Sequence, residues 1–292
     1  MMTMANGMRA LGRRMGSSTI GVVGWLIMAL LLLGVLSTFV IDLPSPVHGN
    51  LAQRLLPPSY RFFAPSAHPL GTDQLGRDML SRLLYGSRVS LMVGFNAVLI
   101  GGMIGVTVGM ISGYAGGVTD RLLMRIVDMQ LSIPLILLAL IVIAATGPSL
   151  GNLIIVLALT SWIRYARLVR GQVLALRQRE FVLSAVAVGA RPWHILRYYI
   201  LPNILTPILV IATLEFSRVI LLEASLSFLG LGVQPPWPSW GRMLAEGRAY
   251  IATAWWVTTL PGLAIVVTVM GANFIGDWLR DYFDPKLKSS GE

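Results

Sequence analysis

Five long stretches of the 292-residue chain contain no aspartate, glutamate, lysine or arginine, and this absence constrains the fold more than any motif does. The stretches cover residues 15–41, 89–119, 129–163, 198–214 and 249–276. A bilayer core of about 30 Å needs roughly 20 apolar helical residues to cross it. Only 12% of all residues are charged, about half the share found in a soluble domain. The sequence therefore predicts an all-α membrane protein and excludes a soluble enzyme, a disordered chain and a disulfide scaffold.

These stretches divide into six expected transmembrane helices, because Gly147-Pro148-Ser149 breaks residues 129–163, which are too long for one crossing. The expected helices are Thr19–Ile41, Ser90–Gly113, Met129–Thr146, Leu150–Tyr165, Leu201–Leu222 and Trp255–Ile275. In the second helix Gly101, Gly105 and Gly109 are spaced by four, which favours close helix packing. Arginines precede the first helix, as in a signal peptide, but its length and the lack of a cleavage site favour a retained anchor.

The positive charges orient these helices. Fifteen arginines and lysines fall on the side of the two chain ends and seven on the other side, so the positive-inside rule places both ends in the cytoplasm. The expected parts are a cytoplasmic end with the first helix (1–41), an external loop (42–89), a core (90–276) with a cytoplasmic loop at 171–200, and a cytoplasmic tail (277–292). In the external loop, Asp73–Tyr85 has its leucines and methionine on one face, which is typical of an interfacial helix.

The composition also limits the chemistry. The chain has no cysteine and three scattered histidines, which predicts neither thiolate chemistry nor a metal site. Its two lysines, Lys286 and Lys288, lie in the tail, so a Gly-Lys-Ser/Thr phosphate loop is absent and any ATP must be bound by another subunit. The net charge of +10 lies between apolar runs, which argues against nucleic acid as a partner. Ser225 and Ser227 have no histidine nearby, so an intramembrane hydrolase has no support.

The cytoplasmic loop holds a short apolar helix that is expected to run from about Glu180 to a stop at Gly189, with Pro192 opening the next turn. The apolar side chains that we expect this helix to expose are Phe181, Val182, Val186 and Val188. Such a surface needs to be covered. It can lie on membrane lipid, with the arginines of the loop on anionic headgroups, or it can dock onto a partner protein. The residues alone leave both possibilities open.

Ionisable residues within the apolar helices also have two readings. Glu215 and Arg218 are three residues apart on one helix face, and charges at this depth need a partner or water. They either line a transport pathway or gate, or form a structural ion pair. Glu223 lies near the outer end of the same helix, where it can cap or gate. Arg125 and Asp128 are spaced to pair with each other.

Several motifs occur in order between residues 68 and 285. They are His68-Pro69-Leu70-Gly71-Thr72-Asp73, Gly76-Arg77-Asp78, Glu180-x8-Gly189-x11-Leu201-Pro202, Glu223-Ala224-x-Leu226-Ser227-Phe228-Leu229-Gly230, Pro238-Ser239-Trp240-Gly241 and Gly276-Asp277-x-Leu279-Arg280-Asp281. With these motifs the chain resembles the C-type permease subunit of dipeptide and oligopeptide ABC importers. The third motif resembles the coupling loop of that family, although Leu183-Ser184-Ala185 stands where the family pattern has Glu-Ala-Ala.

The resemblance implies a type I importer permease, with a core of five helices like that of the methionine importer plus one N-terminal helix, in a bacterial inner membrane. The implied partners are a second homologous permease, two cytoplasmic ATPases that bind ATP and magnesium, and an external substrate-binding protein. The residues that are expected to couple to the ATPase are Glu180, Phe181, Ala185, Gly189, Pro192 and Trp193. The chain itself would bind no cofactor, catalyse no reaction and pass peptides. The alternative is a secondary transporter or channel with Glu215 and Arg218 in its pathway.

Overall fold

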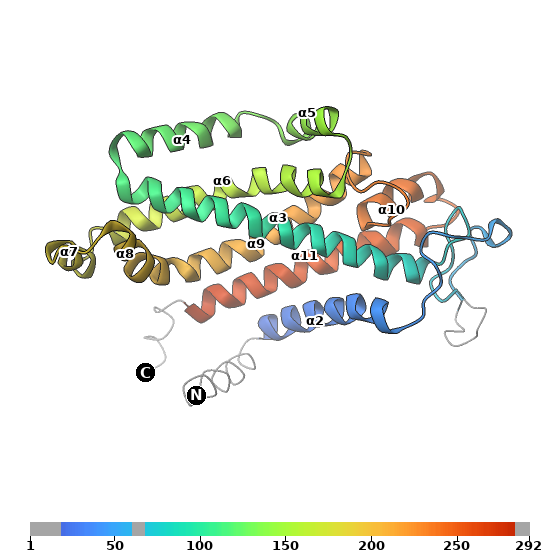
Figure 1. The fold of residues 1–292 in the computed structure, drawn as a ribbon. Coiled ribbons are helices and arrows are strands. Elements are labelled where there is room, and N and C mark those ends of the chain that lie inside the picture. Colours follow the sequence, from blue (N-terminus) through green and yellow to red (C-terminus); the bar gives the residue numbers. More distant parts are fainter. Residues whose placement is uncertain (1–18, 60–67, 284–292) are drawn as a thin grey trace.

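A computed structural model describes residues 19–59 and 68–283, and the long elements within these ranges are all helices that form an elongated bundle (Figure 1). The long helices are α2 (Thr19–Val40), α3 (Met79–Ala115), α4 (Gly117–Leu131), α5 (Leu135–Thr146), α6 (Leu150–Leu176), α9 (Leu201–Phe228) and α11 (Trp256–Phe283). The short ones are η1 (Leu51–Gln53), α7 (Glu180–Ala187), α8 (Pro192–Ile195), η2 (Leu196–Ile200), α10 (Trp240–Gly247) and η3 (Arg248–Tyr250). Predictions for the N-terminal arginines and for residues 284–292 lie outside the described residues.

Five helical stretches among the described residues are long and apolar enough to cross a membrane, and the bent pair α4–α5 makes a sixth if it counts as one broken span. The predicted number of crossings agrees with this, but several predicted boundaries are wrong. α6, α9 and α11 all run past their expected ends, and α6 continues to Leu176, into the expected cytoplasmic loop. The expected interfacial helix over Asp73–Tyr85 does not exist as a separate element, because α3 runs unbroken from Met79 to Ala115. Gly86, a weak helix former, packs against Trp240 of α10 at this point, and this tertiary contact supports the helix through the glycine.

The expected helix Met129–Thr146 is also wrong, because the structure divides it in two. α4 ends at Leu131 and α5 begins at Leu135, and the two helix axes differ by 89°. Pro134 causes the break, because it has no N–H to donate and it disfavours helical geometry at Ile133. The other break is where the sequence predicts it: Gly147 has a left-handed φ of +80°, and the Ser149 side chain caps the start of α6.

Helices α3 and α6 pack against each other more extensively than any other pair, and glycines on α3 make this possible. A Cβ atom at Gly105 would lie 2.2 Å from the carbonyl oxygen of Trp162, and one at Gly109 would lie 2.6 Å from that of Ala166. The spacing of four residues puts these glycines on one stripe of the helix. The predicted role of the stripe in close helix packing is confirmed, with α6 of the same chain as the partner.

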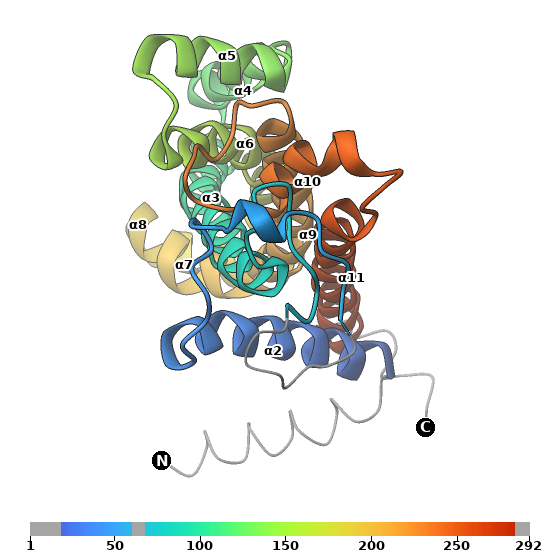
Figure 2. The ribbon, with the colours of Figure 1, turned by 90° about the vertical axis from the view of Figure 1, so that its right-hand side faces the viewer.

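Helix α2 packs on α11 at the edge of the bundle. Gly24 lies against Phe274 and Ile275, and the ring centroids of Trp25 and Trp278 are 6.1 Å apart in an edge-to-face arrangement. In the view along the bundle, α3 lies between α2 on one side and α4 and α5 on the other (Figure 2). Most large apolar side chains of α2 are exposed within the chain, as expected for a helix that borders lipid.

The two ends of the bundle carry different structures. α2 begins and α11 ends at the same end as α7 and α8, which agrees with an even number of crossings (Figure 1). The opposite end holds α10 and residues 42–59 and 68–78, near the start of α3 (Figure 1). Candidate functional groups occur at both ends and in the middle.

Candidate functional site

Residues 180–195 form a short helical projection, which we call the α7–α8 knob, at one end of the bundle (Figure 1). α7 begins at Glu180, as predicted, and Gly189 follows its end with a φ of +81°, a conformation that glycine adopts at little cost. Pro192 stands at the first position of α8, where its missing N–H costs nothing. The chain then continues through the π-helical turn η2 directly into α9, so the knob is joined rigidly to a long helix.

The knob has a buried face and an exposed face. Val182, Ala185 and Ile195 pack with Val169 and Val173 of α6 in one apolar cluster, and Val182 is only 1% exposed. The prediction that Val182 is exposed is therefore wrong, because the helix turns this side chain toward α6. Ala185, which was predicted to contact an ATPase, also lies in this cluster, so its contact is with its own chain.

The remaining apolar side chains of the knob are exposed. They are Phe181, Leu183, Val186, Val188 and Trp193, of which Val188 is 84% and Trp193 is 65% exposed. Glu180, Gly189 and Pro192 are exposed as well. The structure thus brings five of the six predicted coupling residues onto the outer surface of one projection, around a core that holds the projection in place.

Ionic contacts tie this end of the bundle together. The guanidinium of Arg170 on α6 donates two hydrogen bonds to Asp120 on α4, at 2.6 and 2.7 Å, and Arg177 donates to the carbonyl oxygens of Gly113 and Tyr114 at the end of α3. The predicted local pair of Arg125 and Asp128 is wrong. Asp128 instead accepts a hydrogen bond from Arg167 on α6 at 2.6 Å. The packing of α6 beside α4 brings Arg167 within hydrogen-bonding distance of Asp128.

Glu215 lies in the middle of α9 and is 1% exposed. Its two carboxylate oxygens face different arginines: Oε1 is 3.3 Å from Nε of Arg164 on α6, and Oε2 is 3.4 Å from Nη1 of Arg218. The ion pair of Glu215 and Arg218 therefore exists, but no sequence feature pointed to Arg164, which lies near the end of the expected helix Leu150–Tyr165. Both arginines extend to the surface of the chain, and the side chain of Arg164 is 54% exposed.

Glu223 is fully buried where α3, α9 and the start of α10 meet. Its carboxylate accepts hydrogen bonds from the hydroxyls of Ser90 on α3, at 3.1 Å, and Ser227 on α9, at 2.7 Å. Ser239, the N-cap of α10, lies 3.5 Å from Ser227, and the backbone N–H of Trp240 donates to Ser90. This cluster connects α10 to α3 and α9, so Glu223 helps to hold α10 in position.

A second polar network at the same end escaped the sequence-based prediction. Asp73 accepts hydrogen bonds from the side chains of Arg77, at 2.6 Å, and Arg82. Both arginines also donate to Oε2 of Glu246 on α10, at 2.8 Å each. Asp73, Arg77 and Arg82 are buried, and such buried charges are tolerated because every one is paired. Glu246 is the one acidic residue between Glu223 and Asp277, and this isolation was the available signal.

The arginines also determine the protonation of Glu246. Burial alone would raise the pKa of this carboxyl, but the charges of Arg82 and Arg77 and the hydrogen bonds from Arg82 and Arg242 lower the pKa to about 2. Glu246 is therefore ionised at neutral pH. The network links residues 73–77, the start of α3 and α10 into one unit.

The arrangement at the two ends can be compared with known proteins. The sequence profile described as "Binding-protein-dependent transport system inner membrane component" matches residues 105–289. The chain belongs to this family. It is thus a multi-pass membrane component of a transport system of the ABC importer type, and an enzymatic role has no support. The alternative of a secondary transporter or channel finds no support either.

Individual relatives agree with the family assignment. The chain is 48% identical to the dipeptide transport system permease protein of Alkalihalophilus pseudofirmus over 80% of this chain and 77% of that protein. It is 44% identical to the di/tripeptide transport system permease protein of Pseudomonas aeruginosa over 81% of this chain and 78% of that protein. It is 48% identical to the glutathione transport system permease protein of Pectobacterium atrosepticum over 77% of this chain and 74% of that protein.

The fold is shared with a solved importer. A chain of the MetNI methionine ABC transporter, solved in inward-facing conformations, superposes with a TM-score of 0.58 at 24% sequence identity. The match covers 70% of this chain and 98% of that chain. The predicted fold class, a type I importer core with additional N-terminal sequence, is confirmed by this likeness.

Proposed function

We propose that this family member passes short peptides across the bacterial inner membrane and receives its driving force through the α7–α8 knob. It would form one half of a pathway with a second homologous permease. Two cytoplasmic ATPases would bind ATP and magnesium, and an external binding protein would deliver the peptide. The named relatives support the substrate class, because permeases for dipeptides, for di- and tripeptides and for glutathione are all between 44% and 48% identical to this chain.

The exposed apolar surface of the knob is the observation that carries the proposal. Phe181, Val186 and Trp193 lie on a projection that is fixed to α6 on one side and continues into α9 on the other. A rigid projection with an apolar, aromatic surface suits a groove in a partner, where aromatic anchors contribute most of the binding energy. Movement of the partner would then be transmitted to α9 as a rigid-body displacement. Closure of the ATPase pair would open the pathway outward, and hydrolysis would reset it.

The orientation of the chain in the membrane follows from the same proposal. The knob would face the cytoplasm, with the start of α2 and the end of α11, and α10 would face the outside. The arginine-rich residues 167–197 then lie on the cytoplasmic side, as the positive-inside rule requires.

The surface that carries Arg164 and Arg218 would line the pathway. These arginines are partly exposed near the middle of the bundle, and exposure of a guanidinium to hydrocarbon is costly. This surface therefore suits water or the second permease better than lipid. The buried Glu215 between them holds both arginines in position, so the ion pair serves structure and pathway together.

The proposal can be tested with two glycines that both have a positive φ. Gly189 in the knob and Gly147 between α5 and α6 have φ values of +81° and +80°, and a Cβ atom added at either glycine would meet nothing within 4 Å among the described residues. Gly189→Asp and Gly147→Asp therefore both place an aspartate where the backbone disfavours a side chain, but only the first adds a charge to the knob. We expect Gly189→Asp to lower ATP-driven dipeptide uptake by the reconstituted complex at least tenfold, and Gly147→Asp to leave it within twofold.

The charge reversal Glu180→Arg, at the exposed start of α7, should lower uptake in the same way while membrane insertion stays normal. Uptake that is unchanged in both Gly189→Asp and Glu180→Arg would refute coupling through the knob. A wild-type complex that hydrolyses ATP but takes up no peptide would refute the substrate class.

A further inference from the structure

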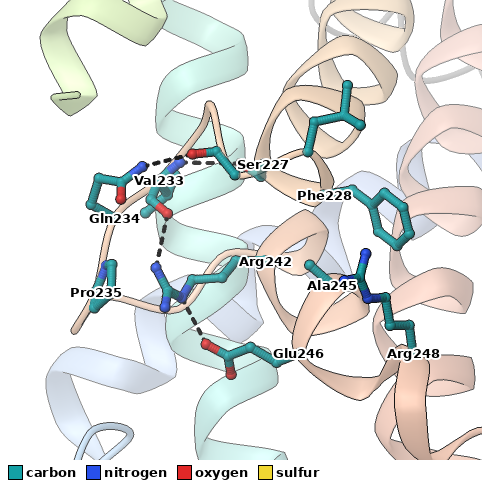
Figure 3. Close-up of a pocket in the computed structure, with 11 residues that line it drawn as sticks. Ser227, Phe228, Val233, Gln234, Pro235, Arg242, Ala245, Glu246 and Arg248 are labelled. Carbon is teal, nitrogen blue, oxygen red and sulfur yellow. Dashed lines mark hydrogen bonds and ion pairs between the residues drawn. The ribbon is translucent and has the colours of Figure 1, made fainter. Parts of the chain in front are cut away.

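A hollow of about 510 Å³ lies at the α10 end of the bundle, between the end of α9, the loop that follows it and α10 (Figure 3). Its walls include Ser227 and Phe228 of α9, Gln234 of the loop, and Arg242 and Glu246 of α10. Arg248, just after α10, completes the lining. The volume falls within the range of sites for small ligands, roughly 300–1,000 Å³. The lining is rich in polar groups, and the hollow opens to the surface.

Within this hollow the carboxylate is already fully engaged. Oε1 of Glu246 accepts a hydrogen bond from Nε of Arg242 at 2.7 Å, and Oε2 accepts hydrogen bonds from Arg77 and Arg82 at 2.8 Å each (Figure 3 shows the first of these). Arg77 and Arg82 share Asp73 as their second partner. Three arginines thus share two carboxylates before Arg248 is counted. Among the residues that line it, the hollow offers no spare anion for a cationic ligand.

Arg248 has no carboxylate partner in the part of the chain that the structure describes. Among residues 19–59 and 68–283, no carboxylate lies within 4.0 Å of its guanidinium, which instead lies 6.0 Å from the centre of the exposed Phe228 ring (Figure 3). With Arg248, this ion-pair group has four arginines and two carboxylates, and Glu223, which accepts a hydrogen bond from Ser227 of the lining, adds a third carboxylate, so an excess of one positive charge remains. Such an excess around a recess attracts an anionic ligand and strengthens its hydrogen bonds.

We propose that this hollow binds the terminal carboxylate of a short peptide through Arg248, with Phe228 beside it, before the peptide enters the pathway. The inference rests on the proposed function, because it takes a peptide as the substrate and the α10 end as the outer side. A free carboxylate is the one anionic group that every unmodified peptide carries, whatever its side chains. A recess favours such a small ligand over the broad contact of a docked protein.

Arg248→Gln tests the inference in the assembled complex, reconstituted in vesicles with its binding protein and ATP. At saturating peptide-loaded binding protein, we expect uptake of a dipeptide to fall about tenfold, the usual effect of one lost charge-assisted hydrogen bond. Arg248→Lys should retain most of the uptake. Arg54→Gln is the matched control, because Arg54 is an exposed arginine at the same end that lies outside the hollow. Equal uptake by wild type and Arg248→Gln would overturn the inference.

The concentration of binding protein at half-maximal uptake separates a peptide from a protein ligand. If Arg248 binds the peptide, Arg248→Gln lowers the maximal rate and leaves this concentration unchanged. A rise in this concentration with an unchanged maximal rate would mean that Arg248 pairs with an acidic residue of the binding protein, which would overturn the inference.

Thiol protection gives a direct readout, because the chain has no cysteine of its own. Ala245 lines the hollow, so Ala245→Cys places a single thiol of this chain inside it. With cysteine-free partners, peptide-loaded binding protein should slow maleimide labelling several-fold, and empty binding protein should not. Equal protection by the empty protein, or protection in anionic-lipid vesicles without any binding protein, would assign the hollow to another ligand and overturn the inference. Absent uptake in the wild type would instead refute the proposed function.

Discussion

Gly105→Ala is expected to destabilise the bundle more than its size suggests, because α3 and α6 are in backbone contact at this position. The added Cβ would lie 2.2 Å from the carbonyl oxygen of Trp162 and 2.5 Å from the Cβ of Tyr165, both of which are fixed parts of α6. Ordinary contact begins near 3.4 Å, so the helices must separate by about 1 Å. A gap of this size forfeits a quarter to a half of the dispersion energy of the atoms that lose contact. Overpacking of this kind costs about 1–3 kcal/mol.

Gly102→Ala is the matched control on the same helix. A Cβ at Gly102 would meet the ring of Tyr165 at 3.5 Å, an ordinary contact, and alanine is the better helix former by about 1 kcal/mol. Gly105→Ala has the same gain in helix propensity, so we expect Gly102→Ala to be neutral or stabilising and the unfolding equilibrium of Gly105→Ala to lie about five- to 150-fold further toward the unfolded state than that of Gly102→Ala. Unfolding in mixed micelles, followed by tryptophan fluorescence, measures both variants. If Gly105→Ala is as stable as Gly102→Ala, the close α3–α6 contact is wrong.

Three further predictions concern the knob and the α10 end. Val182→Ala should cost about 2 kcal/mol of stability, since it leaves a cavity at a buried site. Val186→Ala should leave the melting temperature unchanged and lower ATP-driven uptake. The opposite pattern would contradict the assignment of Val182 to the buried face and Val186 to the exposed face of α7. Glu223→Ala should lower the melting temperature far more than Glu223→Gln, because alanine removes the acceptor of the O–H groups of Ser90 and Ser227, and equal shifts would contradict the cluster. Since the pKa of Glu246 is lowered from an ordinary 4.5 to about 2, its stabilisation of α10, at most about 3 kcal/mol, is complete above pH 4.5 and is lost as the pH falls toward 2. Hydrogen exchange in α10 measured against pH should show this loss in the wild type, and a persistent loss in Glu246→Gln would assign it to another group.

The membrane spans could be predicted from the sequence because lipid imposes its requirement locally, residue by residue, on each helix. The turn at Gly147 and the limits of α7 at Glu180 and Gly189 were also predictable, since each depends on a few adjacent residues. The missed bend at Pro134 belongs to the same class, because the proline was visible and the expected helix was drawn through it. The run of α3 through Gly86 was not predictable, since a contact with Trp240 supports it.

The ionic partners could not be predicted, because they come from distant parts of the chain. Arg77 and Glu246 are 169 residues apart, and no spacing rule connects them. Glu215 was paired with Arg218 on its own helix, and the second partner, Arg164, became apparent only when α6 was placed beside α9. For Glu215 the sequence showed that the charge needed a partner, whereas the network around Glu246 was not predicted, and in both cases only the packing showed what the partners are.

The central claim, that the knob contacts an ATPase, is tested most directly by photocrosslinking from Val188, the most exposed apolar residue of the knob. A benzophenone attached to Val188→Cys, in a chain with no other cysteine, should crosslink to an ATPase subunit in the working complex, and the yield should change between the ATP-bound and nucleotide-free states. The same probe on Gly147→Cys, at the opposite end of the α6 helix, should not reach the ATPase. Crosslinks from Val188 that go only to lipid or water, in a complex that still transports, would contradict the claim.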